Sequence, residues 1–389
     1  MYIILKLNHI SPKGLEKFAP DCYEITSETS QPDAILVRSH RLSPDDIVSP
    51  LKAIARAGAG VNNIPIQVCT GHGIPVFNTP GANANAVKEL VIAAMILSSR
   101  RGYEGIQYVN SIGHVTDAEE MEKLVETNKK NFQGRELAGK TLGVVGLGAI
   151  GSLVADTGLK LGMDVVGFDP ELSVDAAWRL SNETQKMETI RSLLSKSDYV
   201  TLHLPSLDST RDTINSDTVK FFKQGAHLLN FSRGDIVNSS AIISALESGL
   251  IAGYVTDFPT PDLIGKKHAI LLPHLGSGTT EAEDSCAVMA ADQLIDFLEH
   301  GNIKNSVNFP TASLERTSEY RIVLTNKNIP GMLGKIVSFL ADRNINISEM
   351  LNKSRNEIAY NLIDIETPPS PDLLSAIEDI EGVINVRSI

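Results

Sequence analysis

Positive charge is scarce in this chain of 389 residues. It has 35 lysines and arginines against 47 acidic residues, which gives a formal net charge of −12 at pH 7. Because proteins that bind nucleic acids in general need a basic surface, this balance argues against such a partner. Any anionic substrate must instead be met by a local group of arginines, lysines and backbone N–H groups.

Cysteine and long hydrophobic runs are also scarce. The three cysteines, Cys22, Cys69 and Cys286, show no metal-ligand spacing, so we expect no metal site and reduced thiols in the cytoplasm. The apolar run at the N-terminus is too short for a signal peptide and is better read as a first strand, Tyr2–Leu7. No run reaches the length of a membrane span, and we find no repeat or low-complexity tract.

What is present is an α/β pattern. A hydrophobic content of 42% is ordinary for a globular protein, and the length predicts two or three domains. Up to about residue 80, short apolar runs alternate with helical pieces, and residues 86–97 form an apolar helix. Further helical spacing covers residues 281–300.

The middle of the chain is the most regular part. Apolar strands without alternation predict a parallel sheet that helices cover on both faces, in a doubly wound arrangement. The predicted strands are 141–146, 164–168, 198–204, 226–231, 251–258 and 269–274.

The C-terminal part reads as a separate small unit. Residues 308–318 are polar, contain Pro310 and indicate a linker. Residues 319–389 then follow a βαββαβ order, which predicts an α+β sandwich.

A glycine-rich turn follows the first strand of the middle region. The stretch GLGAIG, Gly146–Gly151, matches G-x-G-x-x-G and opens a helix, which is how a pyrophosphate is bound at a helix N-terminus. Asp169 ends the next strand, where a carboxylate accepts hydrogen bonds from ribose hydroxyls and repels a 2′-phosphate. The turn therefore predicts NAD binding; the alternative is a turn that only packs a helix on a strand.

Arg233, Asp257 and His274 each stand at the carboxyl end of a predicted strand, where open α/β sheets bind ligands. A guanidinium can bind a carboxylate, and a histidine can exchange a proton with a hydroxyl while nicotinamide takes a hydride. The set predicts oxidation of a 2-hydroxy acid. Taken singly, Arg233 could be a surface ion pair and His274 an ordinary strand-end histidine.

Five stretches resemble the D-isomer-specific 2-hydroxyacid dehydrogenases. They are RAGAGVNNI (56–64), VFNTPGANANAVKELV (76–91), GKTLGVVGLGAIG (139–151), LLNFSRGDIV (228–237) and PHLGSGTTEAE (273–283). The resemblance implies a Rossmann-type NAD domain, 83–286, inserted into a flavodoxin-like substrate domain, 1–82 with 287–312. It also implies that Arg233 binds the substrate carboxylate and that His274 is the acid/base. The implied cofactor contacts are Gly146, Gly148, Ala149, Ile150, Gly151, Asp169, His203, Pro205, Phe231, Ser232, Asp257 and Gly276.

One family feature is missing. The family usually carries a Glu just before a Pro that holds the catalytic histidine, but here the segment reads DFPTPD. Asp262 is the nearest replacement and our prediction for the acid that orients His274. Asp257 or Glu281 could serve instead, or the histidine could work with a weaker partner.

Family members that act on phosphoglycerate have an Arg-Ser pair where this chain has Arg38 and Ser39. These residues are our first choice for a substrate phosphate, ahead of Arg41, with backbone N–H groups at Ala59, Gly60 and Val61 near the carboxylate. The basic residues Lys129, Lys130 and Arg135 are more simply read as solvated.

The C-terminal unit resembles an ACT domain, a small-molecule sensor, with residues 326–336 as its ligand loop. Asn328 and Asn346 match asparagines that bind serine in regulated relatives, whereas Asn326 replaces a histidine. We expect an amino-acid effector, with serine as the candidate, and a homo-oligomer, dimer or tetramer; the alternative is a purely structural dimerisation module. Alternatives for the whole chain are another 2-hydroxy acid as substrate or a non-catalytic NAD(H)-sensing protein.

Overall fold

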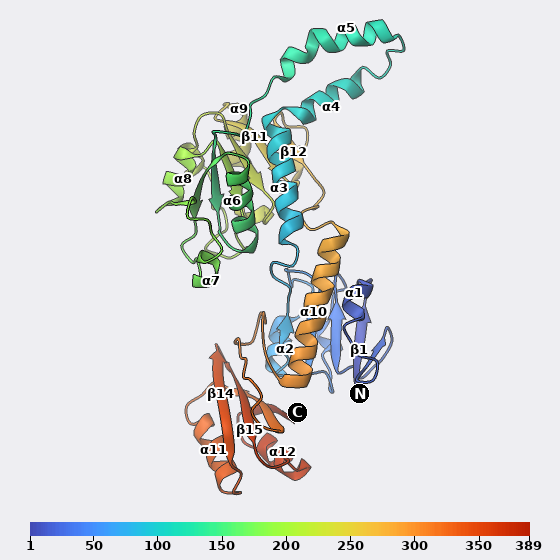
Figure 1. Cartoon of the computed structure of the whole chain (residues 1–389), viewed down its shortest axis with the longest axis vertical. Coiled ribbons are helices and arrows are strands. Elements are labelled where there is room, and N and C mark those ends of the chain that lie inside the picture. The colour runs from blue at the N-terminus through green and yellow to red at the C-terminus, as the bar shows by residue number, and fades with distance from the viewer. The chain divides into compact units, whose positions relative to one another are not determined.

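The computed structural model describes residues 1–389, with the exception of the side chain of Asp175. The chain forms two compact units (Figure 1). Unit 1 combines residues 1–83 with residues 280–389, and unit 2 comprises residues 84–279. Within the described part of the chain, no helix is both long and apolar enough to cross a membrane.

Unit 1 begins with a five-stranded parallel sheet in the order β2-β1-β3-β4-β5. Its strands are β1 (Tyr2–Leu7), β2 (Tyr23–Thr26), β3 (Ala34–Val37), β4 (Ala53–Arg56) and β5 (Val76–Phe77), and its helices are α1 (Pro12–Leu15), α2 (Ile66–Gly71) and α10 (Thr280–His300). Helix α10 packs Ala287, Ala291 and Leu294 into one core with Ala55 and Phe77. A second core on the same strands contains Ile54 and Val76. The α/β pattern predicted for this region is confirmed.

Unit 2 contains a seven-stranded parallel sheet in the order β12-β11-β10-β9-β6-β7-β8. The strands are β6 (Thr141–Val145), β7 (Asp164–Phe168), β8 (Gln185–Lys186), β9 (Tyr199–Leu202), β10 (Ala226–Asn230), β11 (Ile251–Thr256) and β12 (Ala269–Leu271). The predicted doubly wound sheet is confirmed. Strand β8 was not predicted, because its two residues are exposed and polar and carry no apolar signal.

Two separate cores cover the faces of this sheet, as buried parallel strands require. The helices of unit 2 are α3 (Ala84–Ser99), α4 (Gly102–Ser111), α5 (Ala118–Asn128), α6 (Ala149–Lys160), α7 (Val174–Ala177), α8 (Ile190–Lys196) and α9 (Ser239–Glu247). Helices α4 and α5 form an arm that extends away from the sheet of unit 2 (Figure 1).

The C-terminal part of unit 1 has the predicted βαββαβ order. Its elements are β13 (Tyr320–Lys327), α11 (Met332–Ala341), β14 (Ile347–Arg355), β15 (Ile358–Ile365), α12 (Pro371–Glu378) and β16 (Val383–Ser388). The strands form an antiparallel sheet in the order β14-β15-β13-β16. One face packs Leu324 and Ile363 against α11 and α12, while Val323 and Leu362 on the other face join the core of α10.

A buried ion pair holds this C-terminal part in unit 1. Arg321, which is fully buried, donates to both carboxylate oxygens of Asp364 at 2.5 and 2.9 Å. It also donates to the carbonyl oxygens of His300, Leu314 and Glu315. One guanidinium thus joins the end of α10, the linker and the C-terminal sheet.

Candidate active site

The glycine-rich turn lies between β6 and α6. A Cβ on Gly151 would stand 1.9 Å from the carbonyl oxygen of Gly146, and a Cβ on Gly146 would stand 2.5 Å from that of His203. Gly146 also has a φ of +88°, which side chains disfavour. At Gly148, by contrast, a Cβ would meet nothing within 4 Å. The first and last glycines therefore close the turn, and the middle one leaves room for a pyrophosphate at the start of α6.

Asp169 is fixed beside this turn at the end of β7. Its Oδ2 accepts a hydrogen bond from the backbone N–H of Leu147 at 2.8 Å, and its Oδ1 accepts one from Glu171 at 3.0 Å. The carboxylate remains only half-buried. A fixed, accessible carboxylate at this position fits recognition of ribose hydroxyls.

His203 follows β9 and is held neutral. Burial lowers the pKa of its ring to about 3. Its Nε2 lies 3.0 Å from the hydroxyl of Thr201, whereas its buried Nδ1 has no hydrogen-bond partner in the described structure. A neutral ring nitrogen without a partner, next to the turn at Gly146, fits a site that a cofactor completes.

The remaining predicted cofactor residues lie on the same sheet or its helix. Ala149 and Ile150 begin α6, and Pro205 lies two residues beyond His203. Phe231 and Ser232 are buried just after β10, and Gly276 is buried after β12.

Arg233 follows β10 in extended conformation and is half-buried. The side-chain amide of Asn230 donates to its carbonyl oxygen at 2.8 Å, while its own Nη1 donates to the carbonyl oxygen of Ser232 at 2.6 Å. The arginine is thus positioned from both its backbone and its side chain. No ion pair involving Arg233 occurs among the described residues, so its charge is available for an anionic ligand.

Asp257 and His274 meet where β11 and β12 end. Asp257 is 1% exposed, and its Oδ2 accepts a hydrogen bond from the N–H of Gly276 at 2.8 Å. Burial raises the pKa of this carboxyl, although the Gly276 N–H and the charges of His274 and Arg233 act in the opposite direction. His274 is exposed, with a φ of +46° and its ring 4.9 Å from that of Phe258.

The backbone N–H of His274 thus lies 3.0 Å from the carbonyl oxygen of Asp257, and the charges of His274 and Arg233 both favour the ionised carboxylate of Asp257. Asp262 lies in an exposed short helical turn, Pro261–Leu263, and makes no hydrogen bond or ion pair with His274 in the described structure. Its orienting role stays a prediction. Glu281 belongs to α10 in unit 1.

Arg38 and Ser39 lie at the carboxyl edge of the sheet of unit 1. Arg38 follows β3 and donates to Oε1 of Glu283 on α10 at 2.6 Å. The N–H of Ser39 donates to the side-chain oxygen of Asn8 at 3.1 Å. This edge thus carries a cation whose counter-ion, Glu283, the sequence analysis did not identify. Arg41 is exposed next to it.

Two further residues of this edge, Arg56 and Asn78, were not predicted from the sequence. Arg56, the last residue of β4, donates to the carbonyl oxygens of Arg38 at 3.0 Å and Gly60 at 2.5 Å. Asn78 donates to the carbonyl oxygen of Ala59 at 2.6 Å. These two side chains hold the loop Gly58–Val61 in shape. The carbonyl oxygens of this loop therefore already accept hydrogen bonds. Arg56 could have been predicted as a site residue in the same way as Arg233, because it stands at the carboxyl end of a parallel strand.

The three asparagines predicted to bind an effector are not joined by hydrogen bonds in the described structure. Asn328 donates to the carbonyl oxygen of Asn356, and Asn346 is exposed before β14. Asn326 is buried, and its Oδ1 accepts from Asn361, which the sequence analysis did not consider. Asn361 accepts in turn from Asn352 at 2.6 Å, so three amides form a ladder across β13, β15 and β14.

Comparisons with known proteins agree with this architecture. Residues 103–276 match the family model "D-isomer specific 2-hydroxyacid dehydrogenase, NAD binding domain". The chain is 32% identical over 340 residues to D-3-phosphoglycerate dehydrogenase of Haemophilus influenzae, covering 84% of this chain and 78% of that one. It is 33% identical to D-3-phosphoglycerate dehydrogenase of Bacillus subtilis, covering 79% of this chain but only 56% of that longer one.

A solved structure shares the fold. It is 3-phosphoglycerate dehydrogenase of Entamoeba histolytica with bound NAD+, which matches with a TM-score of 0.60 at 24% identity and covers 79% of this chain and 98% of that one. The identity and coverage of the Haemophilus influenzae relative are high enough to assign this chain to the family. The chain belongs to the D-isomer specific 2-hydroxyacid dehydrogenases, which are NAD-dependent enzymes.

Proposed function

We propose that this protein oxidises D-3-phosphoglycerate to 3-phosphohydroxypyruvate with NAD, the first step of the phosphorylated route to L-serine. The observation that carries the proposal is the meeting of Arg233, Asp257 and His274 at the edge of the sheet that also bears the Gly146–Gly151 turn. Relatives that carry this enzyme name over most of their length support the choice of substrate.

Each charged group has a role in this reaction. Arg233 binds the substrate carboxylate through charge-assisted hydrogen bonds. His274 takes the proton of the C2 hydroxyl and becomes an imidazolium. NAD held at the Gly146–Gly151 turn would supply the hydride acceptor for C2, so that a keto group is left. Asp257 stabilises that imidazolium electrostatically; the competing proposal, from the sequence, gives this task to Asp262.

Arg38 and Ser39 are proposed to bind the substrate phosphate. Arg38 is paired with Glu283 in the structure, so phosphate binding must displace or share this contact. An ion pair with side chains 38% and 36% exposed is weak enough to be exchanged for a dianion.

Turnover with a panel of keto acids tests the function. We expect NADH consumption with 3-phosphohydroxypyruvate to exceed that with glyoxylate and 2-oxoglutarate, and Arg38→Gln to reduce this preference selectively. Arg41→Gln, on the same segment, tests the second candidate for the phosphate and should keep the preference if Arg38 binds it. Turnover of all three keto acids at similar rates would support another 2-hydroxy acid as substrate. NADH binding without any turnover would support a sensor protein.

The C-terminal part is proposed to be an ACT domain that binds an amino-acid effector. The βαββαβ order and the amide ladder that begins at Asn326 support this role, because amides can bind both ammonium and carboxylate groups. L-Serine should inhibit turnover, and Asn328→Ala should weaken that inhibition. Inhibition that needs a site between subunits would also require the homo-oligomer that we propose. The three free cysteines fit our proposal of a cytoplasmic location.

A further inference from the structure

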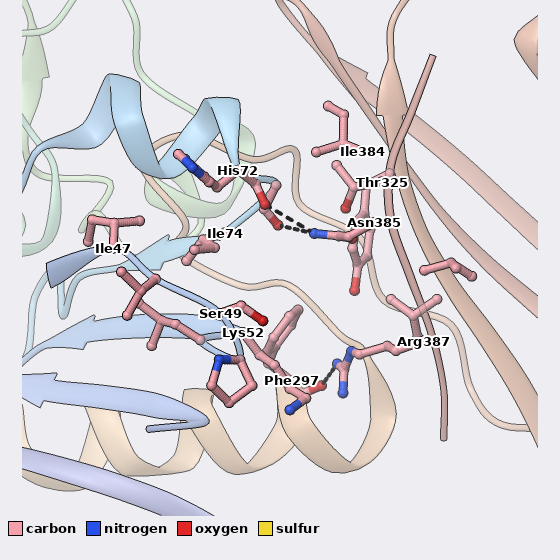
Figure 2. Close-up of a pocket in the computed structure, with 17 residues that line it drawn as sticks. Ile47, Ser49, Lys52, His72, Ile74, Phe297, Thr325, Ile384, Asn385 and Arg387 are labelled. Carbon is pink, nitrogen blue, oxygen red and sulfur yellow. Dashed lines mark hydrogen bonds between the residues drawn. The ribbon is translucent and has the colours of Figure 1, made fainter. Parts of the chain in front are cut away.

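A cavity of about 380 Å³ lies within unit 1, away from Arg38 and away from the amide ladder. Figure 2 shows it between the loops of the first sheet and the strands of the C-terminal sheet. One wall consists of residues 47–52 and 72–74, and the other of residues from β13, β15 and β16, with Phe297 of α10 between them. Its volume lies within the range of small-molecule sites.

The strand wall is a regular array of side chains. Thr325 pairs with Tyr360 on one side and with Asn385 on the other, and Val323 pairs with Arg387. Partners directly opposite in an antiparallel sheet point to the same face. The array therefore lies on the face opposite α11 and α12, whereas the effector loop and the amide ladder belong to the helix-covered face.

The charges at this cavity have one sign. The charged residues of its lining are Lys52 and Arg387, and the lining has no aspartate or glutamate. Lys52 is already paired with Asp33, which lies outside the lining. No carboxylate pairs with Arg387 in the part of the chain that the structure describes. Arg387 is therefore the cation that is available to a ligand.

Arg387 is positioned for such a role. It donates to the carbonyl oxygens of Phe297 at 2.5 Å and Leu298 at 3.1 Å, and its guanidinium lies 4.5 Å from the centre of the Phe297 ring (Figure 2). A guanidinium has five N–H donors, so these contacts orient the group without exhausting it. The carbonyl dipoles at the end of α10 keep the positive charge in place.

The neighbouring groups suit a ligand with one charged end and one apolar end. The amide nitrogen of Asn385 donates to the carbonyl oxygens of His72 and Gly73, which leaves its oxygen without a hydrogen bond in the described structure. The hydroxyl of Thr325 likewise makes none there. Ile47 and Ile74 supply an apolar surface opposite (Figure 2).

We propose that this cavity is a second small-molecule site, which binds a small aliphatic carboxylate. The carboxylate lies on Arg387, the hydroxyl of Thr325 adds a hydrogen bond, and the carbon chain packs against Ile47, Ile74 and Val323. Charge-assisted hydrogen bonds from a guanidinium select the anion, and the apolar wall selects a ligand with a hydrocarbon body.

The test is calorimetric or NMR titration of the full chain with sodium 4-methylpentanoate. This probe has no 2-hydroxy or 2-keto group, so it is no substrate for the proposed reaction. We expect saturable binding, and 4-methylpentanamide, which has the same shape without the charge, should bind about tenfold more weakly or worse.

Four variants locate the binding. Arg387→Gln should weaken it about tenfold or more. Val48→Trp should block it without loss of packing, because Val48 lines the cavity and is 44% exposed. Arg343→Gln is the matched control, since Arg343 also donates to a carbonyl and stacks on a phenylalanine, and it should bind normally. Arg233→Gln should also bind normally while losing turnover.

These variants separate the proposal from its alternatives. Loss of binding in Arg233→Gln with normal binding in Arg387→Gln would place the probe at the reaction site and overturn the proposal. Normal binding in Val48→Trp, equal binding of the amide, or no binding by the parent protein would overturn it as well. None of these results depends on whether phosphoglycerate is the substrate.

Discussion

The backbone N–H of His274 donates a hydrogen bond to the carbonyl oxygen of Asp257 at 3.0 Å, and the carboxylate of the same aspartate is almost completely buried. This carboxylate holds the turn after β12 through the N–H of Gly276. One residue thus sets both the backbone path and the electrostatic environment of the histidine. The missing glutamate of the family pattern therefore does not leave His274 without an acid nearby.

Replacement of Asp257 by Asn should change the pH dependence of turnover. A nearby carboxylate stabilises the imidazolium relative to the neutral ring, so its removal should favour the neutral ring of His274. His274 must be neutral to accept a proton during oxidation of the hydroxy acid. The acidic limb of kcat/KM should therefore move to lower pH, and kcat should fall because the imidazolium product is less stable.

Asp262→Asn is the competing variant for that experiment. If Asp262 orients His274, as the sequence predicts, the shift of the acidic limb should appear in this variant instead. An unchanged profile in Asp262→Asn together with a shifted one in Asp257→Asn would assign the role to Asp257. The opposite pattern would assign it to Asp262, and no shift in either would mean that the histidine works with a weaker partner.

Substitutions at two glycines of the turn should affect NADH affinity and protein stability differently. In Gly148→Ala the new Cβ meets no protein atom within 4 Å, and the φ of −68° suits alanine. Its melting temperature should be unchanged, but NADH should bind about tenfold more weakly or worse because the Cβ takes the space of the pyrophosphate.

Gly151→Ala should instead destabilise the protein, because its Cβ would clash with the turn itself. Its Cβ would lie 1.9 Å from the carbonyl oxygen of Gly146, so the turn must shift, at a cost of about 1–3 kcal/mol in the free energy of unfolding. Thermal melts and fluorescence titrations with NADH would measure both quantities. Unchanged NADH affinity in Gly148→Ala would place the cofactor elsewhere.

Much of this turn and of the strand-end site could be predicted, because their signals are local. Arg233, Asp257 and His274 each follow an apolar strand, and the carboxyl ends of parallel strands share one edge. The Arg38–Glu283 contact could not be predicted in this way, because it joins residues 245 positions apart. Side-chain pairing at that range depends on how α10 packs, which periodicity does not specify.

The C-terminal unit shows the same limit. Its βαββαβ order follows from alternating strand and helix periods, yet the ladder through Asn361 depends on strand register. The cavity beside Arg387 forms only where the C-terminal sheet meets the first sheet, for example where Asn385 donates a hydrogen bond to His72, 313 residues away in the sequence. Neither Asn361 nor Arg387 has a local signal that distinguishes it from an ordinary strand residue.

His227 should make the stability of the protein depend on pH. Burial, and then the charge of Arg135, lower the pKa of its ring from 6.5 to about 4, whereas Glu104 acts in the opposite direction. Between these values the unfolded chain binds more protons than the folded one, so the free energy of unfolding falls as pH falls. From pH 7 to pH 5 the loss from this group should be about 2 kcal/mol. Other facing charges that act on the ring are His268 and Asp198.

Urea unfolding at both pH values would measure this loss. His227→Asn should lose about 2 kcal/mol less than the parent protein on acidification. His114→Asn is the control, because His114 is exposed and should behave like the parent. An identical pH dependence in His227→Asn and in the parent would show that the ring is protonated in the folded protein at pH 5.

The pair of Arg321 and Asp364 should be the main attachment of the C-terminal unit. Burial raises the pKa of Asp364, but hydrogen bonds from Arg321 and Thr317 more than offset this and hold the pKa below its usual range. Asp364→Asn would leave the Arg321 charge buried without a counter-ion, at a cost of about 3–5 kcal/mol. The carbonyl contacts of Arg321 with the end of α10 and with the linker depend on the same guanidinium.

The expected result for Asp364→Asn is an early unfolding transition, with faster proteolysis near residues 308–318, while NADH affinity stays at the parent value. Glu188→Gln is the matched control, because the pair of Lys186 and Glu188 has side chains 76% and 80% exposed and its loss should cost less than about 1 kcal/mol. A small loss in Asp364→Asn would mean that apolar packing alone, through Val323 and Leu362, holds the unit in place. In that case the double variant Arg321→Met with Asp364→Leu should be at least as stable as the parent. An apolar pair that replaces a buried ion pair often keeps or raises stability, and here it would extend the core shared with α10.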